Sequence, residues 1–108
     1  MASEAINLVA IIYPKPEKAA ELSALMAEVT QKVQANEPDT LLYYAFTNEQ
    51  NKDEIIVVER YRNAAALDAH VKGPHIQEFL QKASGLMAKP FELKEGGFLP
   101  ASASVARL

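Results

Sequence analysis

The amino-acid sequence predicts an α+β domain of the ferredoxin-like type, with the element order βαββαβ and one antiparallel sheet. The first observation is that short runs rich in branched and aromatic residues alternate with longer segments of helical periodicity. The second is size, since 108 residues with 49% hydrophobic and 23% charged side chains are typical of one globular domain. We expect residues 1–99 to form this domain and residues 100–108 to form a C-terminal tail.

The first strand and the first helix are marked by prolines. Residues 6–13 are a run of branched apolar side chains that stops at Pro14, which predicts a strand buried on both faces. Pro16 suits a helix start, and residues 16–37 carry an apolar stripe with helical spacing. The stripe consists of Leu22, Leu25, Met26, Val29 and Val33. Pro38 ends this helix.

The middle of the chain predicts a hairpin followed by a capped helix. Residues 40–49 and 54–62 are rich in β-branched and aromatic side chains and are separated by a polar turn, as in two paired strands. Asn63 is a favourable N-cap for a helix over residues 64–72.

The last third begins with a break at Gly73-Pro74, where the proline can open a second short helix over residues 75–83. Residues 89–99 are predicted to form the final strand, with a bulge or bend at Gly96-Gly97.

The predicted sheet is apolar on both faces. In the first strand, Leu8 and Ala10 alternate with Val9 and Ile11, so neither face is polar. The helices of one chain cover only one face. Because packing against the sheet of a second copy is the simplest cover for the other face, we expect a homodimer.

Composition excludes several classes of function. The formal net charge is −3, from 11 basic and 14 acidic residues with no dense basic run, which argues against a nucleic-acid partner. No segment approaches the roughly 18 apolar residues of a membrane span, and the first apolar run is too short for a signal peptide. Cysteine is absent, so disulfides, cysteine-based zinc sites and a thiol nucleophile are excluded. The four glycines form no phosphate-binding loop.

The two histidines are the main candidates for chemistry. His70 follows Leu67 by three residues on the apolar helix face, where a histidine is either a hydrogen-bonded structural residue or a catalytic one. His75 starts the next helix and is expected to be more exposed. The break at Gly73-Pro74 separates the two residues, so they are not expected to share a helical face, and no metal site is predicted.

Four polar side chains stand out within the strands. Asn7 shares a strand face with apolar neighbours and must be hydrogen-bonded if it is buried. Glu59 and Tyr61 share one face of the third strand, where Glu59 can pair with a cation and Tyr61 can pack in the core. Tyr44 is either a core aromatic or part of a ligand-binding wall.

Two long segments resemble a known family. The sequences "YPKPEKAAELSALMAEVTQKVQANEPDTLLYYAF" and "VVERYRNAAALDAHVKGPHIQEF" are similar to the antibiotic biosynthesis monooxygenase domain, which includes quinol monooxygenase-like proteins of the dimeric α/β barrel superfamily. The resemblance covers about residues 5 to 99. It departs from the family pattern at Asp39, where the family usually has glycine. It implies the same fold and a dimer whose two sheets form an α/β barrel.

The resemblance also implies a function. Characterised members oxidise phenols, anthrones or quinols with O₂ and use neither a metal nor a flavin, so the expected activity is that of a cofactor-independent monooxygenase acting on a small aromatic substrate. The implied pocket lies between the helices and the sheet. His70 would act there as base or orienting donor, and Asn7, Tyr44, Tyr61 and His75 would bind substrate.

Two alternatives stay open at the level of sequence. The same dimer can be a non-catalytic module that binds a small hydrophobic metabolite or serves in a stress response. It can also be a structural dimer with a filled core and no cavity. Tryptophan is absent, which argues against the haem-degrading members of the family.

The C-terminus resembles a targeting signal. Ala106, Arg107 and Leu108 have the small–basic–leucine form of the Ser-Lys-Leu peroxisomal address. A eukaryotic source would make a peroxisomal location the expectation, and otherwise the protein is expected in the cytoplasm.

Overall fold

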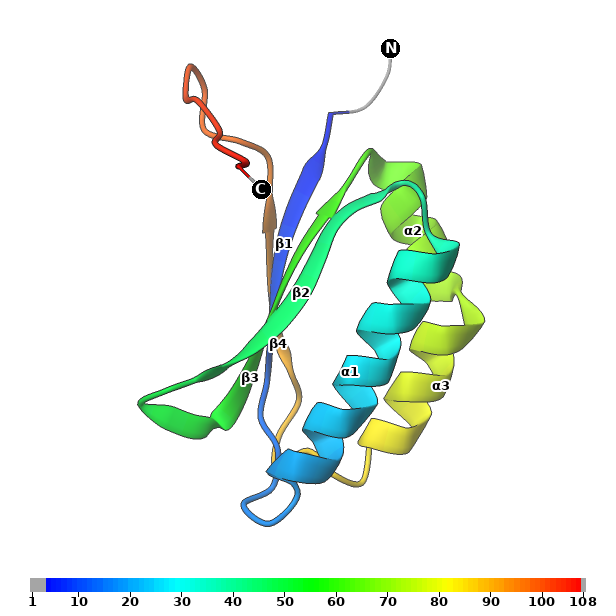
Figure 1. Ribbon diagram of the computed structural model, residues 1–108, viewed down its shortest axis with the longest axis vertical. Coiled ribbons are helices and arrows are strands. Elements are labelled where there is room, and N and C mark those ends of the chain that lie inside the picture. Colours follow the sequence, from blue (N-terminus) through cyan, green and yellow to red (C-terminus); the bar gives the residue numbers. More distant parts are fainter. Residues whose placement is uncertain (1–3, 108) are drawn as a thin grey trace.

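The computed structural model describes residues 4–107, which form one antiparallel sheet with helices on one face (Figure 1). Its elements are β1 (Ile6–Ile12), α1 (Ala19–Asn36), β2 (Thr40–Asn48), β3 (Asn51–Tyr61), α2 (Ala64–Lys72), α3 (Pro74–Ala83) and β4 (Glu92–Gly96). The strand order is β2-β3-β1-β4, and each neighbouring pair is antiparallel. This arrangement confirms the predicted ferredoxin-like α+β fold.

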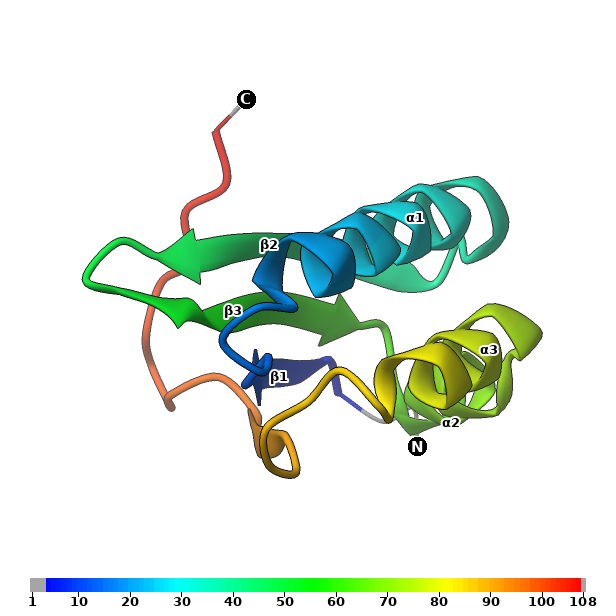
Figure 2. The ribbon, with the colours of Figure 1, turned by 90° about the horizontal axis from the view of Figure 1, so that it is seen from below.

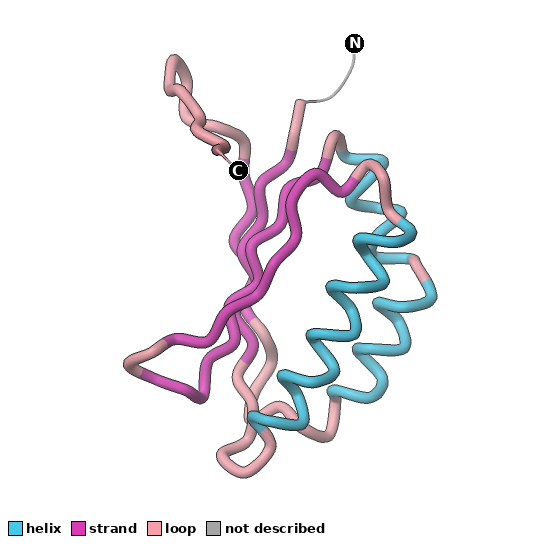
Figure 3. The backbone as a smooth tube through the Cα atoms, in the orientation of Figure 1, coloured by secondary structure: helices cyan, strands magenta, loops and turns pink. Residues whose placement is uncertain are grey.

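The helices form a single layer. Helix α1 packs beside α3, and both lie on the same side of the sheet, as the views of Figures 2 and 3 show. Among the helices of residues 4–107, none is both long enough and apolar enough to span a membrane.

Strand register divides the sheet into two faces. Leu8 pairs with Glu59 and Ala10 pairs with Val57, and all four side chains are buried beneath the helices. The residues between them face the other way. We call the sheet face turned away from the helices the outer face.

The core lies between the sheet and the helix layer. Helix α1 buries four residues of the predicted stripe, Leu22, Met26, Val29 and Val33, while Leu25 is partly buried. Helix α3 contributes Ile76 and Phe79. Because each fully buried aliphatic or aromatic side chain contributes about 1.5–3 kcal/mol, this seam provides the main apolar stabilisation of the helix layer.

Some element ends differ from the sequence prediction. Helix α1 begins at Ala19 and not at residue 16, because a turn comes first in which the Lys18 N–H donates to the Lys15 carbonyl. Strand β4 pairs with β1 from Glu92 to Gly96 and is therefore shorter than the predicted strand over residues 89–99. Pro90 lacks the N–H that would extend this ladder.

The junction between α2 and α3 is a sharp corner. The Asn63 side chain accepts a hydrogen bond from the Ala66 N–H, which confirms it as the N-cap of α2. Gly73 ends α2 with extended backbone, and Pro74 occupies the first turn of α3. A Cβ atom at Gly73 would lie 3.3 Å from the carbonyl oxygens of both Ala69 and His70, so the corner is close-packed.

The outer face of the sheet carries large apolar side chains. Tyr44 and Phe46 of β2 are 47% and 48% exposed, and their rings stack with centroids 6.4 Å apart. Part of the C-terminal segment passes near this face, where the Arg60 guanidinium lies 5.0 Å from the Phe98 ring centroid. Within residues 4–107, Val9 and Ile11 on the same face are only partly buried.

Candidate active site

His70 lies between two carboxylates. Its Nδ1 is 2.7 Å from Glu37 Oε1, and its Nε2 is 4.0 Å from Glu59 Oε1. The imidazole and Glu59 are 5% and 7% exposed, so both groups belong to the interior. Because an ionised carboxylate only accepts hydrogen bonds, the Nδ1–H donates to Glu37 and Nε2 carries the lone pair directed at Glu59.

Aromatic rings surround this imidazole. The ring centroids of Tyr43 and Tyr61 each lie 5.2 Å from that of His70. Tyr61 is fully buried, and its hydroxyl donates a short hydrogen bond to Glu59. The two tyrosines fix the orientation of His70 and keep water from its faces.

The Glu37 carboxylate accepts hydrogen bonds from three side chains. It follows α1 as the C-cap residue, and its carboxylate accepts from Thr40 Oγ1 at 2.6 Å. It also accepts from His70 and, through a short contact, from His75 Nε2. The loop after α1, helix α2 and helix α3 therefore meet at one carboxylate.

Burial sets the protonation of the site. It raises the pKa of Glu59 to about 7, against the opposing effect of the Tyr61 hydrogen bond, and the Glu37 charge adds to the rise. Burial also lowers the pKa of His70, although the hydrogen bond to Glu37 counteracts it. For Glu37 burial acts upward, yet the hydrogen bonds from Thr40 and the two histidines hold its pKa below the ordinary value. Neutral His70 thus faces ionised Glu37, while Glu59 exchanges its proton near neutral pH.

A cavity of about 170 Å³ lies on the sheet side of His70, between the helices and the sheet. Its polar lining consists of Tyr43, Glu59 and His70, and the remaining walls are apolar side chains such as Leu67 and Phe79. A buried carboxylate and an imidazole on the wall of an apolar cavity can take a proton from a small bound molecule.

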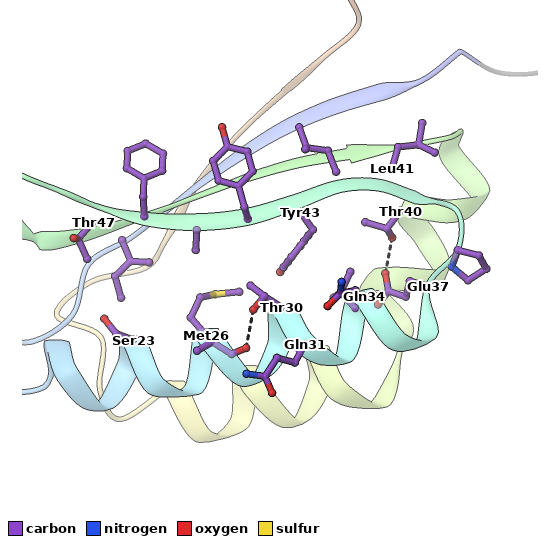
Figure 4. A pocket seen from close by; sticks show the side chains of 18 residues that line it. Ser23, Met26, Thr30, Gln31, Gln34, Glu37, Thr40, Leu41, Tyr43 and Thr47 are labelled. Carbon is purple, nitrogen blue, oxygen red and sulfur yellow. Dashed lines mark hydrogen bonds between the residues drawn. The ribbon is translucent and has the colours of Figure 1, made fainter. Parts of the chain in front are cut away.

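A second, larger hollow lies between α1 and β2, with a volume of about 780 Å³. Figure 4 shows Tyr43 and Thr40 pointing from β2 toward α1, while Leu41 points away. Polar side chains of α1, including Thr30 and Gln34, form the opposite wall. Tyr43 and Met26 line both spaces, so these two side chains lie between this hollow and the His70 cavity.

The structure separates the predicted site residues into two groups. His70 and Tyr61 lie together beneath the helices. Asn7 and Tyr44 lie on the outer face, where Asn7 Oδ1 accepts a hydrogen bond from Arg60 Nε at 2.9 Å. The expectation that Asn7 and Tyr44 would line the cavity beside His70 is therefore corrected, because strand alternation turns them to the other side of the sheet. Tyr61 is fully buried and His75 lines another hollow, so these two predicted substrate-binding residues do not line the cavity either.

His75 also differs from its expected environment. Its side chain is 13% exposed and packs against Glu37, although the sequence predicts a more exposed position. The two histidines do not share a helical face, since His70 lies on α2 and His75 on α3. The corner at Gly73-Pro74 nevertheless folds α3 back so that the two imidazole centroids lie 6.4 Å apart.

Two residues of this site are absent from the sequence-based prediction of site residues. Glu59 was interpreted there as a partner for a cation, whereas the structure pairs it with Tyr61 and His70. Glu37 was not singled out, although an acid at a helix C-terminus is unfavourable toward the helix dipole and signals a compensating partner.

Glu37, His70 and His75 together present donors suited to a metal ion. One ligand atom from each residue lies within 4.8 Å of the other two.

At the end of the chain, the predicted targeting residues Ala106 and Arg107 are exposed and irregular, and Leu108 lies outside the described residues.

The chain matches one protein family over most of its length. A sequence profile of the family described as antibiotic biosynthesis monooxygenase matches residues 5–82. The uncharacterised protein sll1783 of Synechocystis is 33% identical over 93 residues, which are 86% of this chain and 63% of that protein, so this chain spans less than two thirds of that relative. The proposed monooxygenase Rv0793 of Mycobacterium tuberculosis is 26% identical over 85 residues, covering 79% of this chain and 82% of that protein.

Solved structures share the fold. A Caulobacter crescentus protein, proposed to be an antibiotic biosynthesis monooxygenase, superimposes with a TM-score of 0.85 at 25% identity, covering 90% of this chain and 92% of that chain. The Rv0793 structure superimposes with a TM-score of 0.84 at 22% identity, covering 93% of this chain and 100% of that chain.

Proposed function

Because the chain belongs to the antibiotic biosynthesis monooxygenase family, we propose that it oxidises a small electron-rich phenol or quinol with O₂. The observation that carries this proposal is the buried pair of His70 and Glu59 on the wall of an otherwise apolar cavity. In this proposal no metal or flavin activates the oxygen.

The reaction begins with a proton transfer. His70 Nε2 carries a lone pair because Nδ1–H is engaged with Glu37, so Nε2 can accept the phenolic proton, and Glu59, whose Oε1 lies 4.0 Å from Nε2, can share the charge. After that transfer the imidazolium is an orienting donor that holds the phenolate oxygen.

The anion can then reduce O₂ directly. One electron passes from the phenolate to O₂, and the resulting superoxide and phenoxyl radicals combine at a ring carbon to give a peroxide anion. The His70 imidazolium returns its proton to this anion, and the hydroperoxide then loses water, with the hydrogen of the same ring carbon, to leave a quinone. Overall, a phenol with one free ring C–H and one O₂ give a quinone and one water, so the substrate supplies all the electrons. The mostly apolar lining of the cavity supports this sequence, because it places few polar groups beside the intermediates.

Cavity size favours a substrate with one ring. A volume of about 170 Å³ is close to that of an engineered apolar cavity of about 150 Å³ that binds benzene. A single-ring phenol or quinol therefore fits better than a three-ring anthrone.

We also propose that the working form is a homodimer formed through the outer faces. Tyr44 and Phe46 are about half exposed on an apolar sheet face that one chain leaves uncovered. Packing two such faces would bury them, as in other face-to-face sheets. The positions of Asn7 and Tyr44 assign them to this interface in the proposal, and not to substrate binding.

The test is an ¹⁸O₂ experiment with single-ring quinols and phenols in excess EDTA. One labelled oxygen in the quinone product and one in water are expected. His70→Ala should lower kcat by about 10²–10⁴-fold, the range of a positioned general base. Glu78→Gln, which changes an exposed carboxylate on α3, is the matched control and should keep full activity.

Two results would contradict the proposal. Turnover unaffected by His70→Ala would remove this residue from the reaction. Thermal stabilisation by the same aromatics without any product would instead indicate the non-catalytic binding module.

A further inference from the structure

We propose that Glu37, His70 and His75 form a binding site for one divalent ion of the zinc class, on the side of His70 that faces away from the cavity. The ion takes no part in the oxygenase reaction: coordination at His70 Nδ1 would place the ring proton on Nε2, so the ion-bound form would lack the base that the proposed proton transfer uses.

The donor geometry supports a compact site. The donors are the Glu37 carboxylate, His70 Nδ1 and His75 Nε2, and all lie within 4.8 Å of one another. Zinc bonds of about 2.0–2.2 Å in a tetrahedron place neighbouring donors about 3.3–3.6 Å apart. The 2.7 Å between His70 Nδ1 and Glu37 Oε1 is the length of a direct hydrogen bond, so the two side chains would have to separate by rotation to admit an ion.

The fold brings the donors from three separate elements. Glu37 caps α1, His70 lies in the last turn of α2, and His75 lies in the first turn of α3. The corner at Gly73-Pro74 directs both imidazoles to the same carboxylate. An ion at this point would tie the loop after α1 to both later helices.

The negative charge of Glu37 is not paired with a lysine or arginine among the described residues. Within residues 4–107, the ion-pair partners found for Glu37 are the two histidines, and both are neutral when they act as ligands. One carboxylate with two neutral imidazoles has a net charge of −1, which a divalent cation reverses to +1. The neighbouring Asp39 carboxylate is already paired with Arg62 at 2.9 Å.

The second shell fits a metal-bound histidine. Coordination through His70 Nδ1 requires its proton to move to Nε2, which faces the Glu59 carboxylate at 4.0 Å. A carboxylate behind a metal-bound imidazole fixes its tautomer and raises its basicity. Thr40 Oγ1, 2.6 Å from Glu37 Oε1, orients the ligating carboxylate in the same way.

An open hollow of about 630 Å³ lies against the cluster and is lined by His70, His75 and Glu37. An ion can reach the donors through this hollow, and water from it can complete the coordination. Two imidazoles with one carboxylate favour Zn²⁺, Co²⁺ or Ni²⁺ over Mg²⁺ and Ca²⁺, which prefer sets of oxygen donors.

The experiment is calorimetric titration of tag-free, EDTA-treated protein with Zn²⁺ in the absence of any substrate. One Zn²⁺ per chain is expected, and Mg²⁺ should give no saturable signal. His75→Ala and Glu37→Gln should each weaken binding by about 100-fold or more, since loss of a ligand should exceed the 10–100-fold cost of losing a second-shell partner. Glu78→Gln should bind as wild type does.

Co²⁺ gives an independent readout, because bound Co²⁺ should show visible absorption bands of low-coordinate geometry in wild type and not in His75→Ala. Circular dichroism confirms that the variants are folded. Wild-type protein that binds neither Zn²⁺ nor Co²⁺ saturably would overturn the proposal without any need for the variants. Equal affinity of wild type and His75→Ala would overturn it as well.

Discussion

His70 and His75 share one carboxylate, with imidazole centroids 6.4 Å apart on opposite sides of a helix corner. Five positions and a Gly-Pro break separate the two residues in sequence, yet the break is what brings them together. The arrangement gives His70 two distinct edges, one toward Glu37 and the other toward Glu59 and the cavity. The proposed proton transfer uses the second edge and the proposed ion uses the first, and the two exclude each other because an ion on Nδ1 would move the ring proton to Nε2.

Replacing Glu37 should destabilise the fold even without an ion. Glu37→Gln removes the charge that accepts hydrogen bonds from Thr40 and both histidines, and hydrogen bonds to charged groups contribute about 1.5–3 kcal/mol each. We expect a loss of about 2 kcal/mol in the free energy of unfolding, measured by urea denaturation in EDTA. Glu78→Gln, which breaks only exposed ion pairs, should lose clearly less stability. Equal losses in the two variants would contradict a special role for Glu37.

Enlarging Gly73 should disturb the corner. Gly73→Ala brings a Cβ atom to 3.3 Å from two carbonyl oxygens, so the backbone between the histidines must shift. We expect a loss of about 1 kcal/mol, typical of a point mutation, together with a shift in the NMR signals of the His75 ring. Gly85→Ala is the matched control, because a Cβ atom there meets nothing within 4 Å. Unchanged His75 signals in Gly73→Ala would show that the corner does not position this ring.

Substitutions of Glu59 and Tyr61 should lower kcat to different extents. Glu59→Gln removes the carboxylate that shares the abstracted proton, and we expect kcat to fall about 100-fold. Tyr61→Phe keeps the buried ring and loses only the hydroxyl that orients Glu59, so the expected loss is about tenfold or less. Initial rates of O₂ consumption measure both. A larger effect of Tyr61→Phe would reverse the roles assigned to the two residues.

Charges on the outer face should prevent dimerisation. Tyr44→Glu and Phe46→Glu each place a carboxylate on the surface proposed to pack against a second copy. Light scattering after size-exclusion chromatography should give a dimer mass for wild type and a monomer mass for both variants. Gln81→Glu, on the exposed side of α3, should remain dimeric. A monomeric wild type at micromolar concentration would refute the proposed assembly.

Tyr13 should ionise at unusually high pH. Its hydroxyl donates to Glu92 Oε1 at 2.6 Å, and this hydrogen bond, with smaller effects of burial and of the carboxylate charge, raises its pKa to about 12. Because the folded-state pKa is raised, the stabilising effect of this contact is present below the ordinary tyrosine pKa of about 10 and is lost as pH rises toward 12. NMR titration of the Tyr13 ring measures this value. Glu92→Gln should bring it down, and no change would exclude Glu92 as the cause.

The sequence by itself determined the fold. Apolar periodicity placed the stripe from Leu22 to Val33 on the core side of α1, and Asn63 was identified as the N-cap of α2. These features depend on near neighbours in the chain, where spacing and side-chain chemistry decide the local structure. The prediction that His70 faces the sheet has the same origin.

The tertiary structure alone decided the composition of the site. Glu37 lies 33 positions from His70, and no local pattern relates a helix-capping acid to a histidine on another helix. Strand phase assigned Asn7 to the outer face and Glu59 to the cavity, because successive side chains of a strand point to opposite sides of the sheet. Which polar groups meet depends on how separate elements pack, and that information is present only in the folded chain.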